Sequence, residues 1–390
     1  MIQQKIQALA QQFLPEVIAL RRKIHQFPEL AYQEVATSEL VAETLISLGF
    51  TVQKNIARTG VVGVLEGKNP SKKCIALRAD MDALPIEEKN EHSFVSTHTG
   101  KMHACGHDVH TANLLGVAMV LSNLKNEFDG TIKFIFQPSE EKIPSGAAAM
   151  IAEGVLQNPK PVAILGAHVS PELPVGTIGI KAGEFMASAD ELYIKVIGKG
   201  GHAARPAEIN NPLFIAAKLL LAYQQLGNAD TSVILSFGKI EGKGATNVVP
   251  EEVLIEGTLR CFDEKKRVDL HHKIKELAHT IALENNAKIV AEILVGYPVL
   301  INDKALTNDV QTQLMDYLSP DKIITIPKRM GSEDFAYYSQ VLPACFIRLG
   351  TSNEHPDTQH GLHSPYFDVD ENVFATSVGA MSFVALQLLQ

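Results

Sequence analysis

Short runs of Val, Ile and Leu alternate with longer segments of helical periodicity in the first half of this chain. Turn residues bound the apolar runs, which therefore predict strands, while the spacing of apolar residues in the longer segments predicts helices. The expected strands cover about 51–65, 73–78, 131–136 and 162–167. The expected helices cover about 1–27, 34–48, 108–124 and 145–153. This alternation is typical of parallel βαβ units, in which ligands bind where the strands end.

The order of elements changes between about Phe185 and Leu300. The pattern there predicts strand, helix, strand, strand, helix and strand, which is the ferredoxin-like arrangement. Asn211 followed by Pro212 marks the start of the first helix, because Asn caps a helix and Pro fits its first turn. The expected elements are a strand at 189–197, a helix from 211, strands at 232–240 and 253–262, a helix at 264–284 and a strand at 288–294.

The length of 390 residues exceeds that of a typical single domain, and a content of 46% hydrophobic residues is enough to bury a sizeable core. We therefore predict an α/β fold with two domains. The larger domain, 1–184 and 301–390, is discontinuous and has a mainly parallel sheet flanked by helices. An α+β domain of the ferredoxin-like type, 185–300, is inserted into it.

The formal net charge of −9 argues against a nucleic-acid partner, since phosphate binding normally leaves a basic surface. The four cysteines form no close pair, which favours a reducing compartment over a disulfide scaffold. The N-terminal segment lacks the continuous apolar stretch of a signal peptide, and no run approaches the roughly 20 apolar residues of a membrane span. We expect a soluble, cytoplasmic protein with no membrane partner.

The segment MHACGHD carries the first candidate chemistry. Cys105 and His107 lie two residues apart with Gly106 between them, a spacing that allows a loop to bind one ion or two adjacent ions. A buried thiol beside a histidine that hydrogen-bonds to the backbone would look the same. Cys105 and His107 could also act together as a thiol nucleophile and its base.

Two adjacent carboxylates, Glu140 and Glu141, follow the strand expected at 131–136. They would repel each other if both were buried without a cation, although a surface loop would accommodate them. A bound cation would allow one to be a ligand and the other a general base. His168 and His363 are single histidines that also lie beyond strand-like segments, so thiol, carboxylates and imidazoles all gather at predicted strand ends.

At this point the chain resembles the dinuclear metal amidohydrolases and metallopeptidases that include aminoacylases, hippurate hydrolases and indole-acetyl-amino-acid hydrolases. The resemblance spans nearly the whole chain through HQFPEL, LRADMDALP, MHACGHD, FQPSEE, GAHVSP, GKGGHAARP, TNVVP, GTLRCF, GSEDF and FDVDE. It implies that Glu140 is the catalytic general base and that two divalent metal ions are bound. The ligands that it implies are Cys105, His107, Glu141, His168 and His363. Relative to the broader superfamily, Cys105 replaces a common bridging aspartate and Asp80 a common histidine ligand.

The chemistry of such a centre is consistent with this reading. Two divalent ions with one thiolate, one carboxylate and one hydroxide leave a net positive charge, which favours an anionic substrate. Asp82 is expected to accept a hydrogen bond from a histidine ligand and so orient it, although it could instead be a turn residue. A thiolate ligand favours zinc; manganese is equally expected from the mixed donor set, and cobalt or nickel are allowed.

Three residues of the inserted domain complete the predicted site. In the family that the chain resembles, a histidine at the position of His202 stabilises the developing oxyanion in its own or a partner subunit. Asn247 and Arg260 resemble contacts to a substrate carboxylate, which the forked guanidinium matches. Their alternatives are an exposed loop histidine and a solvent-facing arginine. The inserted domain is accordingly expected to act as a lid or dimerisation domain, with a homodimer possible.

The sequence therefore predicts metal-dependent hydrolysis of the amide bond of N-acyl-L-amino acids, with N-acetyl, benzoyl or similar acyl groups. A metallocarboxypeptidase or dipeptidase that acts on short peptides is the alternative enzyme. A non-catalytic binding protein is a further alternative, but binding alone does not require the general base Glu140.

Overall fold

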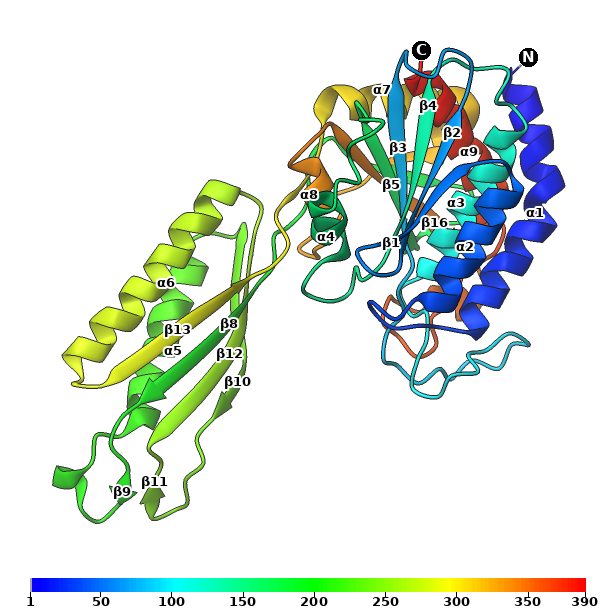
Figure 1. Cartoon of the computed structure of the whole chain (residues 1–390). Helices are drawn as coiled ribbons and strands as arrows, with labels where there is room; N and C mark the ends of the chain where they lie inside the picture. Colours follow the sequence, from blue (N-terminus) through cyan, green and yellow to red (C-terminus); the bar gives the residue numbers. More distant parts are fainter. Residues whose placement is uncertain (1) are drawn as a thin grey trace. The chain divides into compact units, whose positions relative to one another are not determined.

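The structure, a computed structural model, describes residues 2–390 and divides them into two compact units (Figure 1). The larger unit comprises 2–183, Ile301–Pro327 and Asp334–Gln390. The smaller unit comprises Glu184–Leu300 and Lys328–Glu333. The smaller unit thus includes the short segment Lys328–Glu333, whereas the division expected from the sequence assigned everything after residue 300 to the larger domain. The domain roles themselves stay a prediction.

An eight-stranded sheet forms the centre of the larger unit, in the order β1-β2-β4-β3-β5-β16-β6-β15. The pairs β3-β4, β3-β5, β5-β16 and β6-β15 are parallel, whereas β1-β2, β2-β4 and β6-β16 are antiparallel. Its strands are β1 (Thr51–Ile56), β2 (Gly60–Glu66), β3 (Cys74–Asp80), β4 (Thr131–Gln137), β5 (Ile164–Pro174), β6 (Ile178–Ile180), β15 (Ile323–Thr325) and β16 (Ala344–Ser352). The predicted α/β architecture with a mainly parallel sheet is thus confirmed.

Helices flank this sheet, and α3 lies at the centre of the core. Nearly every residue of α3 is buried, because the helix packs against the sheet as well as against α1 and α9 (Figure 1). A helix that is apolar on all sides is typical of such a buried position. The helices of this unit are α1 (Ile2–Gln26), α2 (Val35–Ser47), α3 (His107–Ser122), α4 (Gly146–Ala152), α7 (Lys304–Tyr317), α8 (Ala336–Ser339) and α9 (Val373–Leu388). The rigid core places the residues that follow β3 and β4 at one end of the sheet.

The smaller unit is a four-stranded antiparallel sheet with two helices, as the ferredoxin-like pattern predicted. The strand order is β10-β12-β8-β13, and α5 and α6 pack on each other and on the sheet. Its elements are β8 (Asp190–Ile197), β9 (Gly201–His202), α5 (Pro212–Asn228), β10 (Val233–Glu241), β11 (Val248–Val249), β12 (Glu252–Cys261), α6 (Glu264–Glu284) and β13 (Lys288–Val295). The Asn211 side chain accepts the Leu213 N–H at the start of α5, which confirms the predicted cap.

Two expectations about strands were wrong. The strand expected at 51–65 is a hairpin of β1 and β2, because Ala57 and Arg58 adopt φ values of 48° and 78° and turn the chain. The strand expected to end before His168 continues to Pro174, because β5 pairs with β16 beyond this residue. His168 therefore lies within a strand and not at its end.

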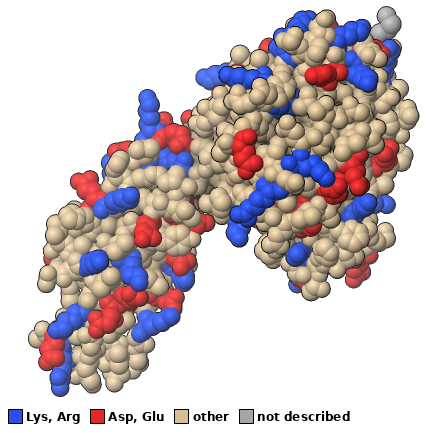
Figure 2. Space-filling view, in the orientation of Figure 1, with Lys and Arg blue, Asp and Glu red and all other residues tan. Residues whose placement is uncertain are grey.

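The surface carries both signs of charge. Figure 2 shows Lys and Arg interspersed with Asp and Glu on the visible face of each unit. No helix between residues 2 and 390 has both the length and the apolar character needed to span a membrane.

Candidate metal centre

Side chains of the types that ligate metals, from four segments of the larger unit, gather beside β3, β4 and β5. Sγ of Cys105 lies 3.4 Å from Nε2 of His168. Nε2 of His363 lies 3.3 Å from Oε1 of Glu141. Nε2 of His107 lies 3.9 Å from that same oxygen, and His107 also groups with Cys105 and His168, so all five ligands implied by the resemblance lie in one cluster. Their roles as ligands stay a prediction.

The five implied ligands and Glu140 make up three overlapping groups of potential ligands. Within each group, the donor atoms lie within 4.8 Å of one another. The groups are Cys105 with His107 and His168, Cys105 with Glu141 and His363, and His107 with Glu140 and Glu141. Cys105, His107 and Glu141 each belong to two of these groups, so the groups share residues and form one continuous set of potential ligands.

The turn at Gly106 brings Cys105 and His107 into this position. Gly106 has φ +81°, and a Cβ there would lie 2.6 Å from Cγ2 of Val169. A side chain is therefore excluded both by the left-handed backbone and by the close approach of β5. Gly106 precedes α3, which begins at His107, and so allows the thiol and the imidazole to lie on either side of a tight turn.

Hydrogen bonds fix the ring orientation of two of the histidines. Nδ1 of His168 is 2.8 Å from its acceptor, the backbone oxygen of Val169, which leaves Nε2 as the lone-pair atom facing Cys105. Nδ1 of His107 lies 3.2 Å from Oδ1 of Asp82, which leaves Nε2 facing the two glutamates. Metal-bound imidazoles commonly have such a partner on their other nitrogen.

His110 is also in the cluster but has no nitrogen left for a metal. Its Nδ1 lies 2.6 Å from Oδ1 of Asp80, and its Nε2 accepts the backbone N–H of Val169 at 2.9 Å. His110 therefore supports the strand β5, although it groups with Asp80 and His107 by distance alone.

Unpaired atoms in the cluster fit a cation. Nε2 of His107 and Oε1 of Glu141 are buried and make no hydrogen bond with any residue in 2–390. Burying polar atoms without a hydrogen bond is costly, and an imidazole nitrogen beside carboxylate oxygens favours a positive charge there, which a proton or a bound cation supplies. Thiolate, imidazole and carboxylate are also the ligands that zinc and related ions use.

The electrostatics of the cluster are consistent with this interpretation. Burial raises the pKa of the Cys105 thiol well above its usual range, and the carboxylates of Glu141 and Glu140 raise it further. Burial alone would lower the pKa of His107, but Asp80 and Asp82 outweigh it and raise this pKa to about 10. The surroundings thus stabilise positive charge and oppose a free thiolate, which disfavours Cys105 as an unassisted nucleophile.

A buried ionic network next to the cluster was missed by the sequence analysis. Arg78 in β3 contacts Asp80 at 2.6 Å and Asp334 at 2.7 Å, and all three side chains are fully buried. Asp334 also accepts hydrogen bonds from Oγ of Ser145 and from the backbone N–H of Ala147 at the start of α4. An arginine inside an otherwise apolar strand was the available signal, because a buried guanidinium requires acidic partners.

Two of the three predicted residues of the smaller unit, His202 and Asn247, lie side by side where β9 pairs with β11, whereas Arg260 lies in β12. His202 is exposed in β9, where its Nδ1 accepts the N–H of Ala204 at 3.1 Å. Asn247 is exposed, and its backbone oxygen accepts the N–H of Ala203. Arg260 in β12 is half-buried and donates to the backbone oxygen of Met330 at 3.0 Å. Their proposed contacts with a substrate stay predictions.

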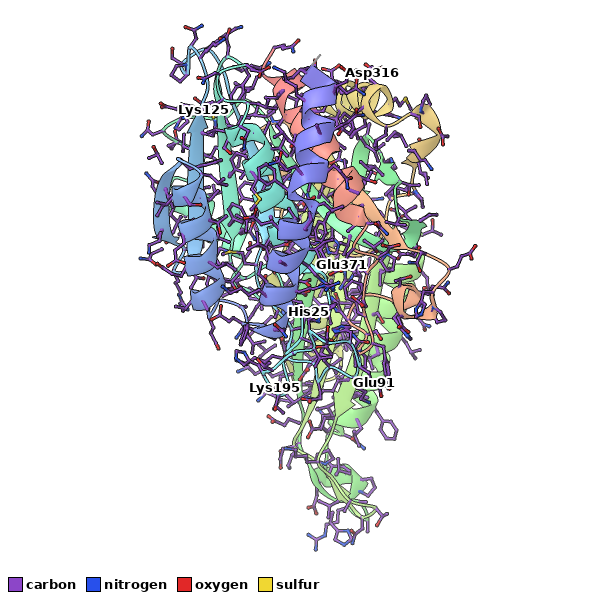
Figure 3. The ribbon with its side chains drawn as sticks, turned by 90° about the vertical axis from the view of Figure 1, so that its right-hand side faces the viewer. His25, Glu91, Lys125, Lys195, Asp316 and Glu371 are labelled. Carbon is purple, nitrogen blue, oxygen red and sulfur yellow. The ribbon has the colours of Figure 1, made fainter. Side chains whose placement is uncertain are left out.

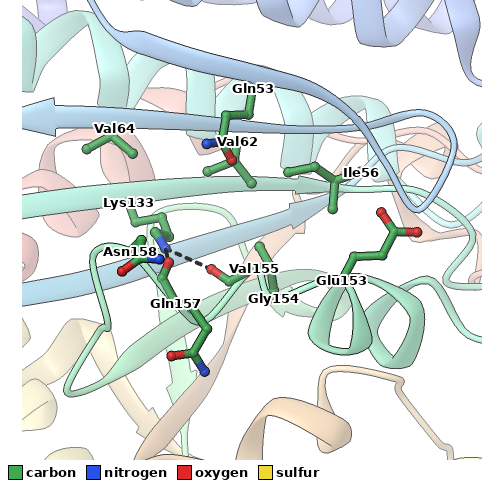
Figure 4. Close-up of a pocket in the computed structure, with 10 residues that line it drawn as sticks. All are labelled: Gln53, Ile56, Val62, Val64, Lys133, Glu153, Gly154, Val155, Gln157 and Asn158. Carbon is green, nitrogen blue, oxygen red and sulfur yellow. Dashed lines mark hydrogen bonds between the residues drawn. The ribbon is translucent and has the colours of Figure 1, made fainter.

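A small cavity elsewhere in the larger unit involves none of the predicted site residues (Figure 4). Lys133 of β4 points into it and donates to the backbone oxygens of Val155 and Gln157 at 2.8 and 2.5 Å. These carbonyl groups hold the buried ammonium in the loop after α4. These contacts anchor the loop to β4.

Known proteins are similar to most of this chain. A model of peptidase family M20/M25/M40 matches residues 76–385. The N-acetyl-L-cysteine deacetylase of Bacillus subtilis is 37% identical over 91% of this chain and 84% of its own length. Thermostable carboxypeptidase 2 of Saccharolobus solfataricus is 36% identical over 95% of each protein.

A solved structure is similar along the whole chain. The crystal structure of a dinuclear metal binding peptidase of the M20 family from Bacillus subtilis has a TM-score of 0.85 and 32% sequence identity. The alignment covers 97% of this chain and 99% of that chain.

Proposed function

The chain belongs to peptidase family M20/M25/M40, and we propose that it hydrolyses N-acyl-L-amino acids to a carboxylate and a free amino acid. That it is a hydrolase acting on amides follows from the family and its relatives. The N-acyl substrate class is supported by the relative that deacetylates N-acetyl-L-cysteine. The observation that carries the metal-dependent mechanism is the cluster of thiol, imidazole and carboxylate groups in which Nε2 of His107 and Oε1 of Glu141 are buried without a hydrogen bond.

The residues that would hold two divalent ions are Cys105, His107, Glu141, His168 and His363. When bound, such ions lower the pKa of water and polarise the scissile carbonyl. Zinc or manganese suits this set of sulfur, nitrogen and oxygen donors, and cobalt or nickel would be accommodated.

The role of Glu140 in this mechanism is that of general base. Its carboxylate is nearly buried, with Oε2 3.9 Å from Nε2 of His107. It takes a proton from the attacking water and donates it to the leaving amine, which must depart as a neutral amine. Asp82 positions the imidazole of His107 and the two glutamates relative to each other. Its carboxylate contacts His107 and accepts the backbone N–H groups of Glu140 and Glu141.

The smaller unit would complete the site. In this proposal His202 stabilises the oxyanion that forms on the carbonyl oxygen, from its own or a partner subunit, and Asn247 and Arg260 bind the carboxylate of the amino acid. The smaller unit would then serve as a lid or as the interface of a homodimer. Four free, buried cysteines support the expectation of a reducing, cytoplasmic location.

The test is hydrolysis of a substrate panel by protein that has been stripped of metal and reloaded with zinc, manganese, cobalt or nickel. The panel contains N-acetyl, N-benzoyl and N-indole-acetyl amino acids, their C-terminal amides, and dipeptides. We expect the N-acyl amino acids to give the highest kcat/KM, and the amides to lose at least about tenfold because the carboxylate contact is removed.

The second candidate is a carboxypeptidase or dipeptidase, favoured by the thermostable carboxypeptidase relative. A higher kcat/KM for dipeptides than for every N-acyl amino acid would establish this alternative. Hydrolysis of neither class by any metal-loaded form would contradict the proposal.

A further inference from the structure

A second group of potential metal ligands lies where the end of α1 meets the loop between β3 and α3. His25 is near the end of α1, as Figure 3 shows, and Glu88 and His92 belong to the loop. Nε2 of His25 lies 3.1 Å from Oε1 of Glu88, and Nε2 of His92 lies 3.4 Å from the same oxygen. Zinc bound tetrahedrally at about 2.0–2.1 Å holds its nitrogen and oxygen ligands roughly 3.3 Å apart. The observed separations therefore fit around one ion.

Each of these three side chains makes a further contact that fixes its orientation. Nδ1 of His25 lies 2.8 Å from Oδ2 of Asp108, a carboxylate partner of the kind that orients metal-bound histidines. The ring of His92 stacks on Phe94, with centroids 3.8 Å apart and planes at 18°. The second oxygen of Glu88 accepts the backbone N–H of Ser96 at 2.6 Å. The remaining donor atoms lie within 4.8 Å of one another, and Oε1 of Glu88 also accepts a hydrogen bond from Nδ2 of Asn90 at 3.1 Å.

His92 lacks the hydrogen bonds that a buried imidazole normally makes. Its side chain is only 19% exposed, and both ring nitrogens are buried without a hydrogen-bond partner in residues 2–390. A neutral imidazole always presents one lone pair that needs a donor or a cation. His107, in the centre around Cys105, has the same signature on its Nε2.

The charge around the two imidazoles is also unbalanced. Four carboxylates and two guanidinium groups lie together there, joined by ion pairs and by the contacts of His25, which leaves two negative charges when the histidines are neutral. These groups are Glu88, Asp108, Asp368, Glu371, Arg21 and Arg22. A proton on His25, shared between Asp108 and Glu88, would neutralise only one of the two charges and would leave His92 unpaired. A divalent cation would neutralise both.

We propose that His25, Glu88 and His92 bind a divalent metal ion of the zinc class at a structural site that shares no ligand with the centre around Cys105. Oδ2 of Asp368 lies 3.9 Å from Nε2 of His92 and can supply a fourth ligand. Two imidazoles with carboxylate oxygens match the preferences of zinc and of neighbouring transition metals. The ion would tie α1 to the loop that leads into the segment carrying Cys105 and His107.

The test is the zinc content of the full-length chain after chelation, reloading with Zn²⁺ and removal of unbound ion, measured by mass spectrometry of the metal. His92→Ala and Glu88→Gln should each bind one Zn²⁺ fewer per chain than the wild type. His98→Ala is the matched control, because it removes an exposed imidazole from the same loop and should leave the zinc content unchanged. Circular dichroism establishes that each variant is folded.

A second arm makes the result independent of the centre around Cys105. A Cys105→Ala, Glu141→Ala double variant should still bind one Zn²⁺, and adding His92→Ala should abolish this binding. The readout is a difference of one ion, so it holds whether or not the proposed catalytic centre binds two. Equal zinc contents of wild type and folded His92→Ala protein, or a double variant that binds no zinc, would overturn the third site.

Discussion

Oδ1 of Asp82 lies 3.2 Å from Nδ1 of His107, and the same carboxylate accepts the backbone N–H groups of Glu140 and Glu141 at 2.9 and 3.0 Å. One side chain thus orients an imidazole at the start of α3 and fixes the turn that follows β4. Because the sheet brings these two segments together, the ring of His107 and the two glutamates are positioned relative to each other before any ion binds.

Replacing Asp82 with Asn should weaken metal binding by about 10- to 100-fold, as losses of partners of metal-bound histidines do. Asn has similar size but no charge, and its amide nitrogen cannot accept one of the backbone N–H groups. Zinc affinity would be measured by competition with a chromophoric chelator. Asp129→Asn, on an exposed carboxylate, is the control; equal affinities of the two variants would rule out the orienting role.

The Glu140→Gln variant should retain its metal content but lose about 10²- to 10⁴-fold in kcat, because Gln cannot accept the proton from water. Steady-state kinetics on the best N-acyl amino acid, together with metal analysis, would measure both quantities. Glu91→Gln, at an exposed position, is expected to behave as wild type. A Glu140→Gln enzyme with wild-type kcat would exclude the general-base assignment.

Chelation should abolish hydrolysis, and added zinc or manganese should restore it. Iodoacetamide should leave the rate of the metal-loaded protein unchanged, since Cys105 is buried and would be bound as a ligand. The cysteine-nucleophile alternative makes the opposite prediction on both counts. Activity that survives chelation but is lost on alkylation of Cys105 would therefore support the thiol mechanism.

Asp334→Ala should lower the free energy of unfolding by about 3–5 kcal/mol, because it deprives the buried Arg78 guanidinium of the Asp334 carboxylate. Asp129→Ala removes a surface carboxylate that pairs with Lys72 and should cost at most about 1 kcal/mol. Urea denaturation of both variants and the wild type measures the difference. Similar losses for the two substitutions would argue against the importance of the buried network.

Stability should depend on pH through Glu34, whose pKa is raised from 4.5 to about 7 by burial, with a contribution from Asp82. The folded state binds this proton more tightly than the unfolded state, so the stabilisation is complete below pH 4.5 and is lost as pH rises through 7. Glu34→Gln removes this dependence. The measured quantity is the free energy of unfolding of the variant minus that of the wild type, from urea denaturation of the metal-free proteins. This difference should be more positive at pH 8 than at pH 4.5. A pH-independent difference would contradict the shift.

The sequence predicted most of the fold because the period of apolar residues reflects burial directly. The buried strands β3 and β4 and the long helix α6 were found within a few residues of their ends. The hairpin between β1 and β2 was not, since the residues that turn the chain with positive φ, Ala57 and Arg58, are not glycines.

Candidate ligands could be found in the same way, because thiol, carboxylate and imidazole stand out in strand-end segments. The residues that surround and support those ligands could not be found from the sequence. Arg78 and Asp334 are 256 positions apart and meet only through the tertiary fold, and nothing local to Asp334 indicates its burial. Likewise, His92 and Glu88 are paired with His25 by the packing of α1.

The packing of α9 against α1 and α3 has a consequence for biosynthesis. The last helix, Val373–Leu388, completes the apolar core around α3, so the larger unit cannot reach its final packing until nearly the whole chain has left the ribosome. The ferredoxin-like unit is almost continuous in sequence and can fold earlier. A chain truncated before Val373 should therefore yield a protease-resistant fragment near 184–300 and a degraded remainder, whereas resistance of both parts would show that α9 is dispensable for folding.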